Sequence, residues 1–225
     1  MTENQAVQQK SVRRNRVAAA ACFAAALITA SVVGTQAATA DGAAHSAPHR
    51  TAVAAPGLGS AHLVQSEDFQ KGMNPVGATI ELTGRQGLSA CSGEETMHDL
   101  TKDKATAYAS VHWTLDTKGM LIESAANAPT GTAAATWEQQ LVALVEGCQD
   151  EPAGHWYYGA AHSLTVTGGT ARWYPAYNGD GTAAGGVAVL RSGTRVAIVE
   201  LTGQPGSTPA AVEGITTAAL NRLSS

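Results

Sequence analysis

The stretch Val187–Leu201, VAVLRSGTRVAIVEL, decides the fold that the sequence predicts. Ser192 and Gly193 separate two apolar runs and form a two-residue turn signal, which is typical of a β-hairpin. With this turn, Val189 lies opposite Val196. Apolar residues occupy both faces of each strand, so we expect the hairpin to be buried on both sides.

A second glycine-rich turn, at residues 168–169, predicts another hairpin just upstream. Its pairing places Leu164 opposite Trp173 on a face that we expect to pack in the core. Arg172 and Tyr174 then point from the other face, which we expect to lie on the outside of the molecule.

Alternating polar and apolar residues predict further strands. Residues 106–115 alternate with period two, and a turn at 116–119 returns the chain through residues 120–126. Another strand is expected at residues 76–82.

Helical periodicity predicts two main helices. The first is capped by Thr132, and the second is capped by Thr208 with Pro209 in its first turn. A weaker third helix is expected after Ser92, because Ser92 and Glu95 match a capping box. The apolar stripes of the two main helices are Trp137, Leu141, Leu144, Val145 and Cys148 in the first, and Val212, Ile215, Ala219 and Leu223 in the second.

Hairpin connections rather than crossovers predict an α+β domain, in which two main helices pack on a mostly antiparallel sheet. The chain has 225 residues and 44% hydrophobic content, enough for one packed domain. After residue 40 it carries ten basic and seventeen acidic residues, a net charge of −7. A domain this acidic is repelled by phosphate backbones, so we expect no nucleic-acid partner.

The first forty residues have the three-part pattern of a secretory signal. Four basic residues precede the apolar run 17–34, which leads to an A-x-A site ending at Ala40. We expect residues 1–40 to be cleaved and the protein to be secreted, by the general secretory route rather than by the twin-arginine export that the Arg13–Arg14 pair also suggests. The alternative is an uncleaved segment that anchors it to the outer face of the cytoplasmic membrane. Residues 41–61, rich in Ala, Gly and Pro, are predicted to be a linker, and 62–225 the folded domain.

The cysteine count predicts a disulfide. Cys22 is removed when the signal is cleaved, so the mature protein keeps two cysteines, Cys91 and Cys148, in an oxidising compartment. Cys148 continues the apolar stripe of the first main helix, so it faces the sheet, where Cys91 arrives from the loop after the first strand. Two isolated cysteines cannot complete a structural zinc site, and no C-x-x-C motif is present for thiol exchange.

The segment Leu63–Asp68, LVQSED, resembles the opening motif of the PknH-like extracellular sensor domain family. The similarity continues through Cys91, the helix ending at Cys148, the hairpin at 191–194 and the terminal helix near Leu223, which is nearly the whole predicted domain. In actinobacteria this domain forms part of receptor kinases and also occurs as stand-alone secreted proteins. The resemblance implies a ligand-sensing domain with an antiparallel sheet, two main helices, a cleft and no established reaction. Kinase-linked members carry two disulfides, whereas this sequence can form one.

No catalytic signature is found in the sequence. It has no G-x-S-x-G motif for a serine nucleophile, and its histidines lack the H-E-x-x-H spacing of zinc enzymes. His45 and His49 have metal-compatible spacing but no third ligand, and the adjacent acids at 94–95 and 150–151 are expected to diverge. We therefore predict no enzyme activity, no cofactor and no metal site. The alternative is an exported hydrolase whose catalytic residues come from distant positions.

Six of the eleven aromatic residues lie between positions 156 and 177. Rings with polar tips suit a groove for sugars, lipids or apolar small molecules, although cross-strand pairing and core filling also explain them. If a cleft is present, we expect Trp156, Tyr158, Arg172 and Tyr174 to bind the ligand, while Trp173 belongs to the core.

Together these features predict a secreted, non-enzymatic sensor or ligand-binding domain for a small molecule or a cell-envelope component. A structural or partner-binding envelope protein is the remaining alternative. The sequence leaves the ligand and the oligomeric state open, and it predicts membrane attachment only if the signal segment stays uncleaved.

Overall fold

The computed structural model describes residues 57–203 and 208–225. The predicted signal at 1–40, most of the linker, and Cys22, His45 and His49 lie outside the described residues. Among the described helices, none is both long and apolar enough to cross a membrane.

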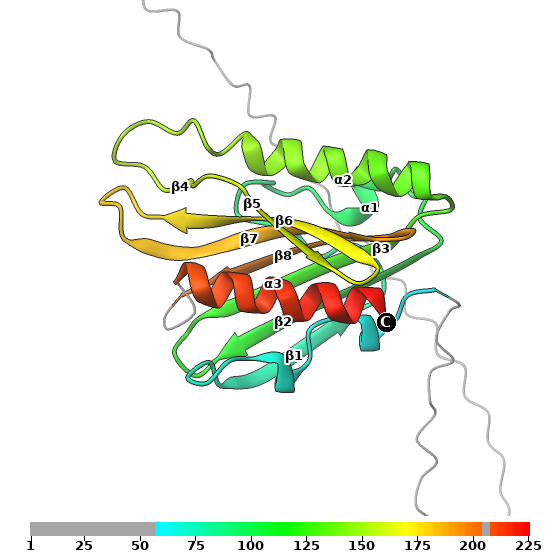
Figure 1. Ribbon diagram of the computed structural model, residues 1–225, viewed down its shortest axis with the longest axis horizontal. Helices are drawn as coiled ribbons and strands as arrows, with labels where there is room; N and C mark the ends of the chain where they lie inside the picture. The colour runs from blue at the N-terminus through cyan, green and yellow to red at the C-terminus, as the bar shows by residue number, and fades with distance from the viewer. Residues whose placement is uncertain (1–56, 204–207) are drawn as a thin grey trace, which may run out of the picture. The chain divides into compact units, whose positions relative to one another are not determined.

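An antiparallel sheet of eight strands forms the centre of the described part, and the order along it is β1-β2-β3-β8-β7-β6-β4, with β5 also paired to β6 (Figure 1). Its strands are β1 (Pro75–Glu81), β2 (Ala107–Leu115), β3 (Met120–Asn127), β4 (Tyr157–Tyr158), β5 (His162–Val166), β6 (Gly169–Tyr177), β7 (Ala183–Ser192) and β8 (Arg195–Thr202). The α-helices are α1 (Met97–Thr101), α2 (Gly131–Glu146) and α3 (Pro209–Ser224), and two short 3-10 helices, η1 (Ser60–His62) and η2 (Ser66–Asp68), precede β1. The predicted α+β class, with two main helices on a mostly antiparallel sheet, is confirmed.

The central strands are buried on both faces, as the hairpin sequence predicts. In β7, Val187 and Val189 belong to the cluster beneath α2, whereas Ala188 and Leu190 belong to the cluster beneath α3. The residues of β8 alternate in the same way. The two long helices therefore cover opposite faces of the sheet, and each face has its own apolar core.

In both hairpins the two-residue turn lies one residue away from its predicted position, so the pairing of the strands differs from the prediction. In the β7–β8 hairpin Ser192 pairs with Arg195, so the turn residues are Gly193 and Thr194 and Val189 lies opposite Ile198. Gly193 has a φ of +56°, and glycine adopts this conformation without steric cost. The shift moves the pairing by two residues, so every side chain keeps its predicted face.

The β5–β6 hairpin shifts because Gly169 is a strand residue. Val166 pairs with Gly169, which leaves Thr167 and Gly168 in the turn. A Cβ at Gly169 would lie 2.7 Å from Leu220 Cδ1 of α3. The glycine therefore lets α3 pass close above the strand, rather than making the turn.

The helices begin close to their predicted starts. In α2 the Thr130 side chain accepts a hydrogen bond from the Ala133 amide, so the N-cap lies two residues before the predicted Thr132. Thr96, rather than Ser92, caps the short helix α1. For α3 the predicted cap, Thr208, is confirmed.

Packed structure starts before the predicted domain boundary at residue 62. Leu58 is only 3% exposed, and Arg195 Nε donates to the Gly57 carbonyl at 2.6 Å. Leu58 and the Gly57 carbonyl, which lie in the predicted linker, therefore contact the folded domain.

Candidate functional site

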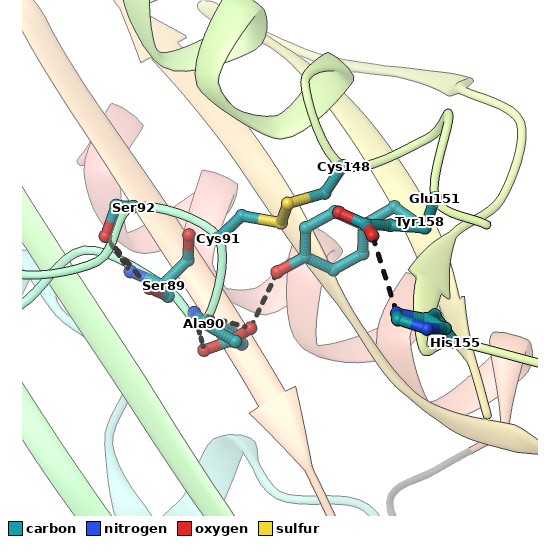
Figure 2. The surroundings of a disulfide bond; sticks show 9 residues. Ser89, Ala90, Cys91, Ser92, Cys148, Glu151, His155 and Tyr158 are labelled. Atoms are coloured by element: carbon teal, nitrogen blue, oxygen red, sulfur yellow. Dashed lines mark hydrogen bonds and ion pairs between the residues drawn. A yellow bond between two sulfur atoms is a disulfide. The ribbon is translucent and has the colours of Figure 1, made fainter. Parts of the chain in front are cut away.

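The predicted disulfide joins Cys91 to Cys148, with a Cα–Cα distance of 6.2 Å (Figure 2). Cys91 lies in the loop between β1 and α1, and Cys148 follows the end of α2. The Cys148 carbonyl accepts a hydrogen bond from the Tyr158 amide at 3.1 Å. The bond thus connects the loop that carries Ala90 to the short strand that carries Tyr158.

Donors from both sides of the disulfide converge on one buried carboxylate, that of Glu200 in β8. The Tyr158 hydroxyl donates to Glu200 Oε1 at 2.6 Å. The Ala90 amide lies 3.1 Å from Oε1 and 2.9 Å from Oε2. Figure 2 shows Ala90 next to Cys91 and the Tyr158 ring beside the disulfide. Glu200 is 6% exposed and Tyr158 is 1% exposed, so the cluster lies inside the protein.

Burial dominates the electrostatics of this cluster. It raises the pKa of Glu200, while the hydrogen bonds from Tyr158 and the Ala90 amide offset part of that rise. Burial, and then the neighbouring Glu200 charge, raise the pKa of Tyr158, so the phenol remains protonated and acts as the donor. In residues 57–203 and 208–225, Glu200 takes part in no ion pair. It is therefore a desolvated acid that lacks a positive partner there.

A cavity of about 310 Å³ opens beside Glu200. Its wall is mostly apolar, with the Ile122 side chain and the 41%-exposed Met120 on the β3 side. Ser89 Oγ is buried and makes no hydrogen bond with the described part of the chain. The lining residues are Gly87, Ser89, Ala90, Met120, Ile122, Glu200 and Thr202. We call this cavity the Glu200 pocket.

The aromatic residues predicted to line a cleft lie in different environments. Tyr158 is the one that contacts Glu200, and Trp156 packs edge-on against it with ring centroids 4.6 Å apart. Arg172 lies outside, where its Nη1 is 3.3 Å from Glu146 Oε1. Trp173 is in the core beneath α3, as predicted.

The prediction that Tyr174 faces outward is wrong. Tyr174 is 0% exposed and belongs to the apolar cluster beneath α2. Its strand does present that side chain on the face opposite Trp173. However, α2 covers this face, so both faces of β6 are interior there.

A second buried carboxylate lies on the other face of the sheet. Glu123 of β3 is fully buried, and its Oε2 accepts a hydrogen bond from the Val64 amide at 2.6 Å. Its Oε1 has no hydrogen-bond partner in the described residues. Burial raises the pKa of Glu123 to about 8, the Val64 amide lowers it, and the Asp68 charge raises it. The hydrogen bond between the Val64 amide and Glu123 holds the segment before β1 against the sheet.

The described histidines do not assemble a catalytic group with serine. His98 Nε2 is 3.2 Å from an Asp103 carboxylate oxygen, and the His162 ring stacks on Trp173 at 4.2 Å. No serine–histidine hydrogen bond occurs within 57–203 and 208–225, and no cluster of three metal-ligating side chains is found there.

The sequence prediction missed Glu200, Ala90 and Ser89 as site residues. An isolated acid within the apolar run of β8 was the available signal, and Glu123 in β3 follows the same pattern. A charge on a strand that is buried on both faces must be satisfied by distant groups, which marks it as a candidate for structure or function.

The fold and the site define a disulfide-bonded antiparallel α+β domain with a buried carboxylate in the wall of a small pocket. No family model matches the chain, and no curated protein sequence matches it. Among solved structures, it is similar to the extracellular domain of PknH from Mycobacterium tuberculosis. That likeness has a TM-score of 0.47 and 12% sequence identity, and it covers 73% of this chain and 93% of the other.

Proposed function

We propose that this chain is an extracytoplasmic, non-enzymatic ligand-binding domain of the PknH-like sensor type. In this proposal the ligand is a small molecule, either free or part of a cell-envelope component, and it occupies the Glu200 pocket. One observation carries the proposal: an apolar cavity has a buried carboxylate in its wall, positioned by donors on both sides of a disulfide. Preformed apolar pockets with a few convergent polar groups are typical of small-molecule sites.

The extracytoplasmic location is supported by two independent features. The N-terminal sequence has the basic, apolar and A-x-A parts of a secretory signal. Disulfides persist mainly in oxidising compartments, and the Cys91–Cys148 bond positions the Ala90 amide and β4. The assignment to the PknH-like family rests on the residues quoted above, on the element order and on the cysteine placement.

A binding role fits the chemistry of the pocket better than a catalytic one. Glu200 already accepts hydrogen bonds from two protein donors, the Tyr158 hydroxyl and the Ala90 amide, and Ser89 Oγ has no base bonded to it among the described residues. A serine nucleophile requires such a base to remove its proton. We therefore expect a fluorophosphonate activity probe to leave Ser89 unlabelled.

The predicted ligand residues take different roles in this proposal. Tyr158 is a positioning residue that holds Glu200, and Trp156 supports its ring. Arg172 and Tyr174 lie away from the pocket lining, and their contacts are with Glu146.

A fragment screen followed by nuclear magnetic resonance tests the proposal. We expect fragments with an apolar ring to shift the Ala90 amide and the methyl signals of Met120 and Ile122 in the oxidised protein. The variant Ile122→Trp fills the pocket and should abolish these shifts, whereas Val76→Trp on the exposed edge strand should not. Fragments that bind only elsewhere, or shifts that survive Ile122→Trp, would contradict the proposed pocket.

A further inference from the structure

We propose that the natural ligand of the Glu200 pocket carries a protonated amine, which pairs with the Glu200 carboxylate while its apolar part packs against Met120 and Ile122. This inference rests on the proposed function, because it names the class of molecule that the same pocket takes. The charge of the pocket, the free capacity of the carboxylate and the size of the cavity each support it.

The carboxylate lacks a positive partner on every element packed around it. The β3 and β7 residues directly opposite Glu200 are Ile122 and Val187, and neither titrates. The loop 87–91 contributes Gly87, Ser89, Ala90 and the bonded Cys91, and β4 contributes Tyr158. Tyr158 is thus the one titratable group that faces Glu200 in the described structure, and it is neutral. A bound cation supplies the missing charge.

Glu200 also has room for another donor. An ionised carboxylate has about four acceptor positions. Oε1 lies within bonding distance of both the Tyr158 hydroxyl and the Ala90 amide, whereas Oε2 has only the amide at 2.9 Å. Oε2 therefore keeps acceptor capacity that the described protein donors do not fill, and the proposal assigns this capacity to the ammonium group. Hydrogen bonds between charged groups are about twice as strong as neutral ones, and burial strengthens them further.

An anionic ligand is excluded by the same charges. The folded part of the chain is acidic, and Glu200 is the charged side chain in the pocket wall. A neutral alcohol can bond to Glu200, but it leaves the carboxylate charge without compensation. For ligands of equal size, we therefore expect the pocket to bind an amine more tightly than an alcohol, and an alcohol more tightly than a carboxylate.

The cavity volume limits the apolar part of the ligand. A closed apolar cavity of roughly 150 Å³ holds a benzene molecule, and the Glu200 pocket measures about 310 Å³. Benzylamine, benzyl alcohol and benzoate share one ring and one carbon substituent, so they form a matched set of probes.

The experiment measures the dissociation constants of these three probes on the oxidised protein, from chemical shifts of the Ala90 amide and the Met120 methyl group. We expect benzylamine to bind at least about tenfold more tightly than benzyl alcohol at pH 7.5, a difference of about 1.4 kcal/mol. Benzoate should not bind.

The variant Glu200→Gln keeps an acceptor for Tyr158 and removes the charge. It should eliminate the preference for benzylamine while benzyl alcohol binding stays within about twofold. The matched control Glu94→Gln removes an equal charge from an exposed loop position and should retain the preference. A preference that persists in Glu200→Gln would overturn the inference.

The pH dependence of the unmodified protein provides a second measurement if Glu200→Gln does not fold. Benzylamine affinity should rise with pH as Glu200 loses its proton, because benzylamine itself remains protonated through neutral pH, whereas benzyl alcohol affinity should not rise. Equal affinities for benzylamine and benzyl alcohol, or a benzylamine affinity that does not change with pH, would overturn the amine inference. Neither result would contradict the proposed pocket. If none of the probes shifts these signals, the proposed pocket itself is contradicted.

Discussion

Glu123 and Glu200 lie on neighbouring strands, but their side chains point to opposite faces of the sheet. Each is an isolated acid within an apolar strand, and each accepts a hydrogen bond from the backbone of a loop distant in sequence. Glu123 binds the Val64 amide, and Glu200 binds the Ala90 amide. A buried acid therefore fixes one irregular segment to each face of the sheet.

The stability of the domain should depend on the protonation of Glu123. The pKa is about 8 in the folded state and near 4.5 when the chain is unfolded. Because the pKa of Glu123 is raised in the folded state, protonated Glu123 favours folding. Its contribution to the free energy of unfolding is fully present below about pH 4.5 and is lost as the pH rises toward about 8. The slope of this loss is at most about 1.4 kcal/mol per pH unit.

The variant Glu123→Gln should remove this loss, since glutamine stays neutral and can still accept from the Val64 amide. We expect it to match the natural protein near pH 4.5 and to be more stable at pH 8, as measured by urea unfolding across that range. Glu94→Gln, at an exposed position, should reproduce the natural profile. A Glu123→Gln profile that falls with the same slope would show that Glu123 is not the responsible group.

At the level of single elements, sequence patterns predict the strands and helices well but misplace their ends. The faces of β7 and β8 follow directly from alternation, so they survive the two-residue shift in pairing. The shift itself depends on which glycine takes a positive φ and which packs beneath α3. Such close approaches are tertiary properties, and a turn motif does not contain them.

The N-cap of α2 gives a direct test of an element boundary. Thr130→Ala removes the acceptor for the Ala133 amide and should cost about 1 kcal/mol of folding free energy. Thr132→Ala should cost little, because alanine is the better helix former inside the first turn. Chemical denaturation of both variants measures this difference. A larger loss of folding free energy for Thr132→Ala than for Thr130→Ala would show that Thr132, the cap predicted from the sequence, is the N-cap.

For the whole molecule, the fold class and the disulfide could be predicted because they depend on alternation, helical period and the number of cysteines. The candidate site could not. Glu200 receives its donors from residues 42 and 110 positions away in sequence. The burial of Tyr174 likewise depends on α2 covering a face that the hairpin alone leaves open. Both features result from how distant elements pack.

The disulfide should contribute a large share of the stability of the molecule. It links residues 57 positions apart, and closing such a loop in the unfolded chain is worth about 4 kcal/mol. The double variant Cys91→Ser/Cys148→Ser should lose that amount in denaturant unfolding. Reducing the natural protein should give the same loss, and reductant should not change the double variant further. A loss below about 1 kcal/mol in both cases would contradict this contribution.

The central claim is that Glu200 is a desolvated acid in the wall of a pocket lined by the loop 87–90, β3 and β8. The most direct measurement is the pH titration of its carboxyl carbon by nuclear magnetic resonance in the oxidised protein. We predict a pKa above the ordinary glutamate value, because burial outweighs the bonds from Tyr158 and Ala90. An ordinary or lowered pKa would mean that water or a positive group already satisfies Glu200, which would contradict the account.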